Sequence, residues 1–369
     1  MHALRTCALM ILVSLTTSSS SASDPIHSLR QPIYPDTRNI LPPGFAAANV
    51  LARPLANLTS NHTRYVLSLA LHYGPDDLCA FVRSWRLHCP ETHLVLFVYE
   101  QQLNTLPQLG VELVVLREFP ATHAMNQWRF YAFAAYMDER GQHIRGVVLS
   151  DARDVLLQHN IWLNPHVHHA LRNQELLFSL EGNYFGDGKS HNVLLQPDGS
   201  FPGAEYGAKL NMQWIEECFG SEVAREMQAH KSAVSCAGVT IGSRAVMGSY
   251  LREFLHVLES VASARCKAIN GDQAIHNYLL WYLGRKGKLG FNAVAFGNGV
   301  SPVYTVGYGL PVSVNAMGQV LVSRGPADHF VPDLVHQYDR NAKLASALRT
   351  AYRCSEPMQI TTIDSDTVR

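Results

Sequence analysis

Short apolar segments alternate with amphipathic helical segments between residues 65 and 150. Uninterrupted apolar runs of this kind are typical of strands that are covered on both faces. Strand followed by helix, repeated within so short a stretch, indicates right-handed βαβ units in a doubly wound parallel sheet. We therefore predict an α/β fold. Strands are expected at 65–70, 92–99, 111–116 and 146–150, and helices at 76–88, capped by Asp76 or Asp77, and at 126–140, with a short helix before the third strand.

The second half of the chain is less regular, and it contains no repeat and no clear linker. Gly, Asn and Asp are frequent from 181 to 207, which predicts a long loop of a kind that is usually functional or disordered. One composite domain is expected at 64–345, followed by a C-terminal tail at 346–369. Within the domain, further strands are expected at 176–180 and 236–243, helices at 211–219, 244–263 and 272–284, and short strands and turns at 291–336.

The first 23 residues have the pattern of a targeting segment. Arg5 precedes an apolar run at 7–15, and small residues follow it, as in a secretory signal peptide. The run is shorter than the roughly 20 residues that span a bilayer. No permanent transmembrane span is therefore expected, and a short signal anchor is the alternative. Residues 24–63 are rich in Pro, Ser and Asn and are expected to form a lead-in or stalk, in which Asn57 and Asn61 each open a glycosylation sequon.

Cysteine content and charge are compatible with the secretory route. Of the seven cysteines, Cys7 lies in the leader, and the remaining six permit disulfides in an oxidising compartment or remain as buried thiols. They lack CxxC spacing, which argues against a zinc site. The chain has 30 basic and 30 acidic residues, so no basic excess indicates a nucleic-acid partner. We expect the protein in the lumen of the ER or Golgi, or outside the cell.

Two carboxylates, Asp151 and Asp154, follow directly after the apolar strand expected at 146–150. In open α/β sheets, ligands bind just outside the carboxyl ends of the strands. Acidic oxygens in that position suit a hard divalent cation, and such a cation suits a phosphate-bearing ligand. The pattern therefore indicates a metal-assisted transferase site for a nucleotide-sugar. The alternative is structural, with Asp154 capping the turn and Arg153 paired with a neighbouring acid.

Three other α/β chemistries fit these residues less well. A dinucleotide-binding sheet needs a G-x-G-x-x-G turn after its first strand, and residues 71–77 do not contain one. A nucleotidyltransferase needs a Gly-rich loop with Lys or Arg at the same place, and residues 71–77 have no basic side chain. An aspartyl-phosphate phosphatase has its two acids two residues apart after the first strand, whereas here the spacing is three and the strand is the fourth.

Five sequence blocks resemble a known group of proteins. They read VLSDARDVLLQ (148–158), NMQW (211–214), CAGVTIG (236–242), GDQAIHN (271–277) and VHQYDR (335–340). In this order they resemble a poorly characterised group of GT-A-type nucleotide-sugar glycosyltransferases, over residues 64–345. The resemblance implies a Rossmann-like GT-A fold, with a mixed, mostly parallel central sheet flanked by helices. The chain departs from the group at Leu157, where Phe is usual, and Asp154 comes one residue later than in a strict DxD motif.

The resemblance also implies an activity. A glycosyltransferase of this type moves a sugar from a nucleotide-diphosphate donor to a hydroxyl of a glycan, protein or lipid acceptor. Mn²⁺ is the expected cofactor and Mg²⁺ the other candidate, held by Asp151, Asp154 and His336 against the donor diphosphate. The alternative for His336 is a histidine in a Tyr–Asp network. The alternative function is a catalytically silent, secreted protein of the same fold that binds a sugar or a nucleotide.

Four more residues are candidates for the donor site. Arg129 is expected to bind the donor phosphates, because a planar guanidinium makes bidentate phosphate contacts, or else to be a solvated face residue. Asp272 is the general base if the enzyme inverts the anomeric centre and a donor-sugar ligand if it retains it, or else a helix cap. Gln273 is assigned to the same site. Gly238 either lets the backbone approach the sugar or serves tight packing.

Overall fold

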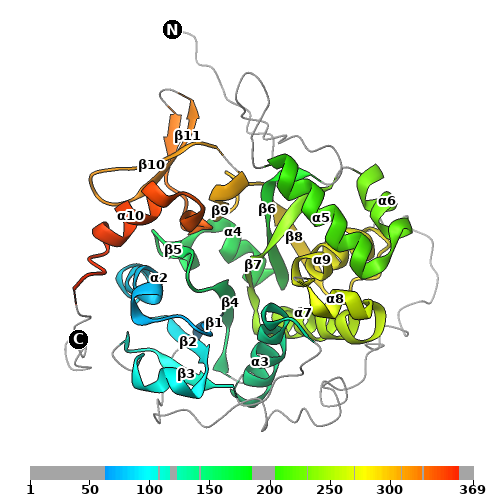
Figure 1. Cartoon of the computed structure of the whole chain (residues 1–369), viewed down its shortest axis with the longest axis horizontal. Helices are drawn as coiled ribbons and strands as arrows, with labels where there is room; N and C mark the ends of the chain where they lie inside the picture. The colour runs from blue at the N-terminus through cyan, green and yellow to red at the C-terminus, as the bar shows by residue number, and fades with distance from the viewer. Residues whose placement is uncertain are drawn as a thin grey trace.

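The structure, a computed structural model, describes residues 63–356 except 107–108, 117–122, 141–142, 185–203, 231, 270, 309 and 326–327. The expected leader, the lead-in with Asn57 and Asn61, and the end of the tail lie outside the described residues. A seven-stranded sheet in the order β3-β2-β1-β4-β7-β6-β8 forms the centre of the molecule (Figure 1). Its strands are β1 (Arg64–Leu69), β2 (His93–Val98), β3 (Glu112–Val115), β4 (Gly146–Asp151), β6 (Glu175–Tyr184), β7 (Ala233–Ser243) and β8 (Asn292–Phe296).

The sheet is mixed but mostly parallel. Strands β1 to β4 are mutually parallel, and β6 is parallel to β8. Strand β7 runs antiparallel to both of its neighbours, β4 and β6. The α/β fold and the mixed, mostly parallel sheet that the sequence led us to expect are therefore confirmed.

Helices cover both faces of this sheet because its strands are apolar on both faces. Along β2, Leu94, Leu96 and Val98 pack with α2 and α4, whereas Val95 and Phe97 point the other way and pack with α3 and α7. The helices are α2 (Pro75–His88), α3 (Met125–Arg140), α4 (Pro165–Arg172), α5 (Ala204–Phe219), α6 (Ser221–Ala229), α7 (Arg244–His256), α8 (Ala264–Ala268), α9 (Asp272–Asn277) and α10 (Ala342–Ala351). The π-helices η6 (Val257–Val261) and η7 (Tyr278–Leu283) continue α7 and α9, and the short 3-10 turns are η2 (Glu100–Asn104), η5 (Ile161–Leu163), η8 (Val306–Tyr308) and η9 (Tyr338–Arg340).

Two local expectations were wrong. The N-cap of α2 is Gly74, and Asp77 instead lies inside the first turn, where its carboxylate accepts a hydrogen bond from the Gly74 N–H at 3.0 Å. The loop expected at 181–207 is strand at its start, because β6 continues to Tyr184, and helix at its end, because α5 begins at Ala204. The rest of that expected loop, 185–203, lies outside the described residues.

A smaller lobe combines β5, which follows β4 directly, with the part of the chain that comes after β8. Strand β13 (Leu334–His336) lies between β5 (Val155–Leu157) and β9 (Val303–Thr305). A second three-stranded sheet contains β10 (Val312–Val314), β11 (Val320–Gly325) and β12 (Asp328–Phe330). Helix α10 closes the lobe, and the boundary expected after residue 345 lies within this helix.

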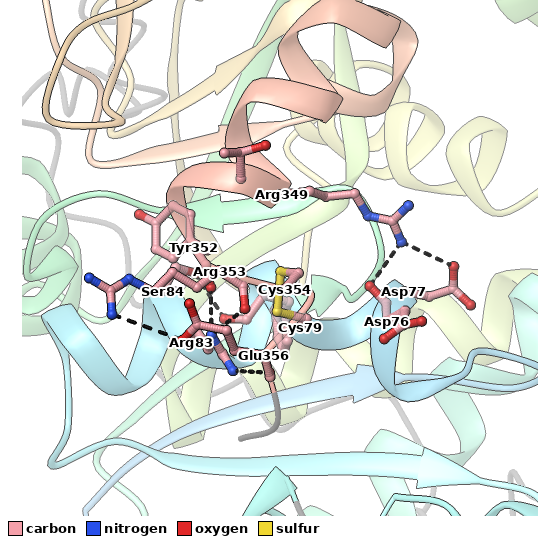
Figure 2. Close-up of a disulfide and its surroundings, with 12 residues drawn as sticks. Asp76, Asp77, Cys79, Arg83, Ser84, Arg349, Tyr352, Arg353, Cys354 and Glu356 are labelled. Atoms are coloured by element: carbon pink, nitrogen blue, oxygen red, sulfur yellow. Dashed lines mark hydrogen bonds and ion pairs between the residues drawn. A yellow bond between two sulfur atoms is a disulfide. The ribbon is translucent and has the colours of Figure 1, made fainter. Parts of the chain in front are cut away.

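Two disulfides join distant parts of the described chain. Cys79 on α2 is bonded to Cys354, 275 positions later, and Cys218 is bonded to Cys266. Figure 2 shows the first crosslink, beside which Arg83 donates hydrogen bonds to backbone carbonyls of the C-terminal segment. Cys89 and Cys236 are buried thiols. Disulfides indicate an oxidising compartment. Among the described residues, no helix combines the length and the apolar character needed to cross a bilayer.

Candidate metal centre and acidic site

The candidate site residues meet at one edge of the main sheet, where β4 ends. Because β7 is antiparallel to β4, the first half of β7 reaches the same edge, and Ser150 is paired with Val239. Gly238 therefore lies beside Asp151. The N-terminal turns of α3 and α9 bring Arg129 and Asp272 to this edge, where both contact residues of the site. This is the position at which open α/β sheets bind their ligands.

Asp151, Asp154 and His336 form a compact group of possible metal ligands. Each offers one ligand atom, and these atoms all lie within 4.8 Å of one another. The Nε2 atom of His336 is 3.3 Å from Asp151 Oδ2 and 3.9 Å from Asp154 Oδ1. The expected ligand set is thus brought together as a possible metal site.

Pairing between small strands places His336 in this group. Asp151 is the last residue of β4, a turn at 152–154 follows, and β5 begins at Val155. In the antiparallel pair of β5 and β13, Val155 is the partner of His336. The Tyr338 hydroxyl, in the turn η9 directly after β13, donates to the carbonyl of Arg153 at 2.8 Å. The three-residue spacing of the two acids therefore fits a turn that leads into β5.

Arg153, between the two acids in the sequence, pairs with an acid outside the ligand group. Its guanidinium lies 2.7 Å from Asp339 Oδ2, and about half of its side chain is exposed. Of the structural alternative, the pairing of Arg153 with a neighbouring acid is therefore present. Asp154 nevertheless lies within the group of possible metal ligands.

A glycine makes room for the ligands. A Cβ atom at position 238 would lie 2.4 Å from His336 Cε1 and 2.6 Å from Asp151 Oδ2. Contacts that short do not occur between real side chains, so one of the two ligands would have to move. Gly238 is required by the close approach of these side chains to the backbone of β7.

The two acids have opposite pKa shifts. Burial raises the pKa of Asp151, but the charge of Arg129 and the hydrogen bond from His336 outweigh it and hold the pKa at about 2. Burial raises the pKa of Asp154 to about 6, and the neighbouring Asp151 charge adds to this. The Asp151 side chain is 34% exposed and that of Asp154 only 13%, so solvent reaches the group mainly at Asp151.

His336 is buried between the two acids and a thiol. Burial disfavours its charged form, but Cys236 and the two carboxylates raise its pKa well above the ordinary value. Its Nδ1 atom lies 3.4 Å from the Sγ of Cys236, whose own pKa burial raises to about 11. Nε2 faces the carboxylates, so Nε2 is the atom available to a cation. A cation would replace protons in this group, because metal ligands must be deprotonated.

Arg129 connects two acids of the site. Its NH1 group donates to Asp151 Oδ1, and its NH2 group donates to Asp272 Oδ2 at 2.6 Å. The residue is only 8% exposed, so it is not a solvated face residue. Burial opposes its charge, but the two carboxylates together raise its pKa.

Asp272 is buried at the first turn of α9. The N-cap of that helix is Gly271, and the Asp272 carboxylate instead accepts hydrogen bonds from Asn126 Nδ2 and Arg129, each at 2.6 Å. Burial raises its pKa, and the positive charge of Arg129 only partly offsets this. The carboxylate is therefore held in place by two donors beside the candidate metal group.

Gln273 belongs to a second polar layer. Its side-chain amide donates to Asn211 Oδ1 at 2.8 Å and lies 3.5 Å from Glu181 Oε1. Sequence reasoning did not single out Asn126, Glu181 or Cys236. The signal for Cys236 was its place in the CAGVTIG block, whereas the two others have no local signal, because they come close to the site only through tertiary packing.

Comparison with known proteins adds no assignment. A scan against protein-family models found no match, and a search of curated proteins found none either. What the chain does must therefore be argued from its α/β fold and from the buried Asp–Asp–His group.

Proposed function

We propose that this protein is a metal-dependent glycosyltransferase, which moves a sugar from a nucleotide-diphosphate donor to an acceptor hydroxyl. The observation that carries the proposal is the group of Asp151, Asp154 and His336 at the carboxyl edge of β4. Two carboxylates and an imidazole there suit a cation that binds a diphosphate. The mixed, mostly parallel sheet agrees with the GT-A fold that the sequence blocks imply.

The ligand set favours Mn²⁺, with Mg²⁺ as the second candidate. Carboxylate oxygens suit both Mn²⁺ and Mg²⁺, and imidazole suits transition metals, so the mixed set agrees better with Mn²⁺ than with Mg²⁺, whereas soft thiolate ligands select other metals. The sulfur of Cys236 faces the Nδ1 side of His336, whereas the carboxylates face Nε2. A cation bound here would act as a Lewis acid on the departing nucleotide diphosphate. Asp151, Asp154 and His336 would hold it.

The neighbouring residues would orient the donor. Arg129 fixes Asp151 and Asp272 relative to each other, because one guanidinium bonds to both. Asp272 then presents a buried carboxylate with a raised pKa, which suits either proton abstraction from the acceptor hydroxyl or a hydrogen bond to the donor sugar. Gln273 directly follows Asp272 in α9, and its amide donates a hydrogen bond to Asn211.

Calorimetric titration with UDP and GDP, with and without Mn²⁺, tests the donor site. We expect metal-dependent nucleotide binding in the parent protein, and its loss in Asp151→Asn, because the cation loses one charged ligand. Asp328→Asn is the matched control, since Asp328 is exposed on β12 and is not a member of the ligand group. Nucleotide binding that ignores both Mn²⁺ and Asp151→Asn would contradict the proposal.

A turnover assay then separates an enzyme from a silent binding protein. The release of free nucleotide is measured over a panel of nucleotide-sugars with mixed acceptors. We expect Asp272→Asn to bind Mn²⁺ and nucleotide normally and to lose about 10²- to 10⁴-fold in turnover, the usual contribution of a general base. Nucleotide binding without turnover of any donor in the parent protein would favour the silent binding protein instead.

A further inference from the structure

A second groove lies at the opposite edge of the main sheet. There β1 begins at Arg64, β4 begins at Gly146 and β7 ends at Ser243, and these three residues are register neighbours. The groove has a volume of about 910 Å³ and is open to solvent. It shares no residue with the candidate metal centre, and a ligand can bind there whether or not the protein transfers a sugar.

Arginines dominate the lining of this groove. Arg64, Arg145, Arg172 and Arg244 line it together with one acid, Glu91. Glu91 lies 3.4 Å from Arg64 and so offsets one positive charge. The remaining positive charges contrast with the balanced charge of the whole chain, which has 30 basic and 30 acidic residues. Such a concentration of positive charge attracts anions.

Three of these arginines are not engaged within the protein. In the part of the chain that the structure describes, Arg145, Arg172 and Arg244 have no side-chain hydrogen bond or ion pair. The Nε atom of Arg244 is buried and without a partner there. Arg244 also begins α7, whose positive helix end faces the groove through Ser243 and Ala245. A buried guanidinium nitrogen needs an acceptor, so an anion from outside suits this place.

We propose that the groove binds a sulfated polysaccharide chain. A guanidinium pairs with a sulfate through two parallel hydrogen bonds, and four arginines in one groove suit a ligand that carries several such groups. A volume of about 910 Å³ holds a chain segment, far more than one ion. The disulfides place the protein in an oxidising compartment.

Two other anionic partners fit less well. Among the described residues, no exposed large hydrophobic side chain lines the groove, so it lacks the apolar contacts that insert into a membrane surface. A peptide would use a free strand edge or apolar pockets. The groove offers Ile144 and Leu171 as its only large aliphatic residues.

Calorimetric titration with a heparin-derived hexasaccharide tests the proposal. We expect Arg145→Ser and Arg172→Ser each to weaken binding by about tenfold, the usual loss of one hydrogen-bonded charge. The affinity should also become less sensitive to salt. In a plot of log affinity against log salt concentration, the magnitude of the slope should decrease by roughly one for each arginine removed. Arg225→Ser is the matched control, because Arg225 is exposed on α6, where its guanidinium donates to the carbonyl of Ser221 in the same helix, and it does not line the groove.

A variant that binds the hexasaccharide more tightly is a stronger test, because a misfolded variant would bind it more weakly. Glu91→Gln removes the one acid of the groove and should tighten hexasaccharide binding about two- to fivefold, the size of one surface charge interaction. The proposal is overturned if the hexasaccharide does not bind, or if the Arg145→Ser/Arg172→Ser double variant binds as tightly as the parent. Binding to vesicles of phosphatidylcholine with phosphatidylserine, without binding to the hexasaccharide, would equally overturn it in favour of a membrane surface.

Discussion

At the scale of single residues, the candidate metal centre depends on the absence of a side chain at Gly238. Gly238→Ala places a Cβ where His336 and Asp151 now lie, so one ligand must turn away. We expect Mn²⁺ affinity to fall about 10- to 100-fold, the effect commonly seen when the support of a metal ligand is disturbed. Calorimetry with Mn²⁺ measures it.

Gly297 supplies the matched control for this substitution. A Cβ at Gly297 meets no atom within 4 Å, and its backbone is not in the left-handed region. Gly297→Ala should therefore leave Mn²⁺ affinity unchanged. Equal affinity in Gly238→Ala and the parent protein would mean that a cation, if bound, does not use both Asp151 and His336.

A buried histidine makes stability depend on pH. His276 bonds to the hydroxyls of Ser235 and Tyr250, and burial lowers its pKa to about 3, with the charge of Arg129 acting in the same direction. The unfolded chain protonates this residue below pH of about 6.5, whereas the folded protein does not. Unfolding therefore takes up a proton between pH of about 3 and 6.5, and the free energy of unfolding falls as the pH falls through this range.

Denaturant titrations between pH 4 and 6 measure this dependence. His276→Gln should reduce the slope of the free energy of unfolding against pH by about 1.4 kcal/mol per pH unit, the value for one proton. His329, which is exposed on β12 and is replaced in the same way, is the control. An unchanged slope in His276→Gln would show that the histidine titrates alike in both states.

At the scale of elements, the first half of the chain was predictable because its strands are apolar on both faces and its helices have apolar residues at helical spacing. The second half was harder. The end of β6, 181–184, is polar and resembles a loop, and its pairing with β7 is visible only in the fold, as in the pair Tyr184 and Ala233. The antiparallel direction of β7 likewise has no local signal, although it is what brings Gly238 and Cys236 to the site.

The candidate site, like the fold, was predictable only in part. Asp151 and Asp154 follow from the position of acids after a buried strand, which is local information. His336 was predicted only through the sequence blocks, because no residue near it in the chain indicates that it packs beside the end of β4. The forked contact of Arg129 with Asp151 and Asp272 was not foreseen, because it depends on how α3 and α9 meet in space.

At the scale of the whole molecule, the Cys79–Cys354 crosslink holds the C-terminal segment that carries His336. Removing it as Cys79→Ala/Cys354→Ala should lower the free energy of unfolding by roughly 2–5 kcal/mol, because it closes a loop of 275 positions. Mn²⁺ affinity should also fall, since β13 and α10 lose their covalent attachment to α2.

The second crosslink is the control for this effect. Cys218→Ala/Cys266→Ala removes a disulfide that closes a loop of 48 positions beside α9, away from β13. We expect it to lower stability without changing Mn²⁺ affinity. If both double variants bind Mn²⁺ as the parent does, the crosslink at Cys354 has no part in shaping the centre.

The division of the candidate metal centre between distant parts of the chain has a consequence during synthesis. Asp151 and His336 are 185 positions apart. A ribosome that adds 5–20 residues per second needs roughly 10 to 40 s to pass from one to the other. A nascent or truncated chain that ends before His336 cannot complete the ligand group. Ligation of a cation by all three side chains would therefore require a chain that has been made at least as far as His336 and has folded β13 into place.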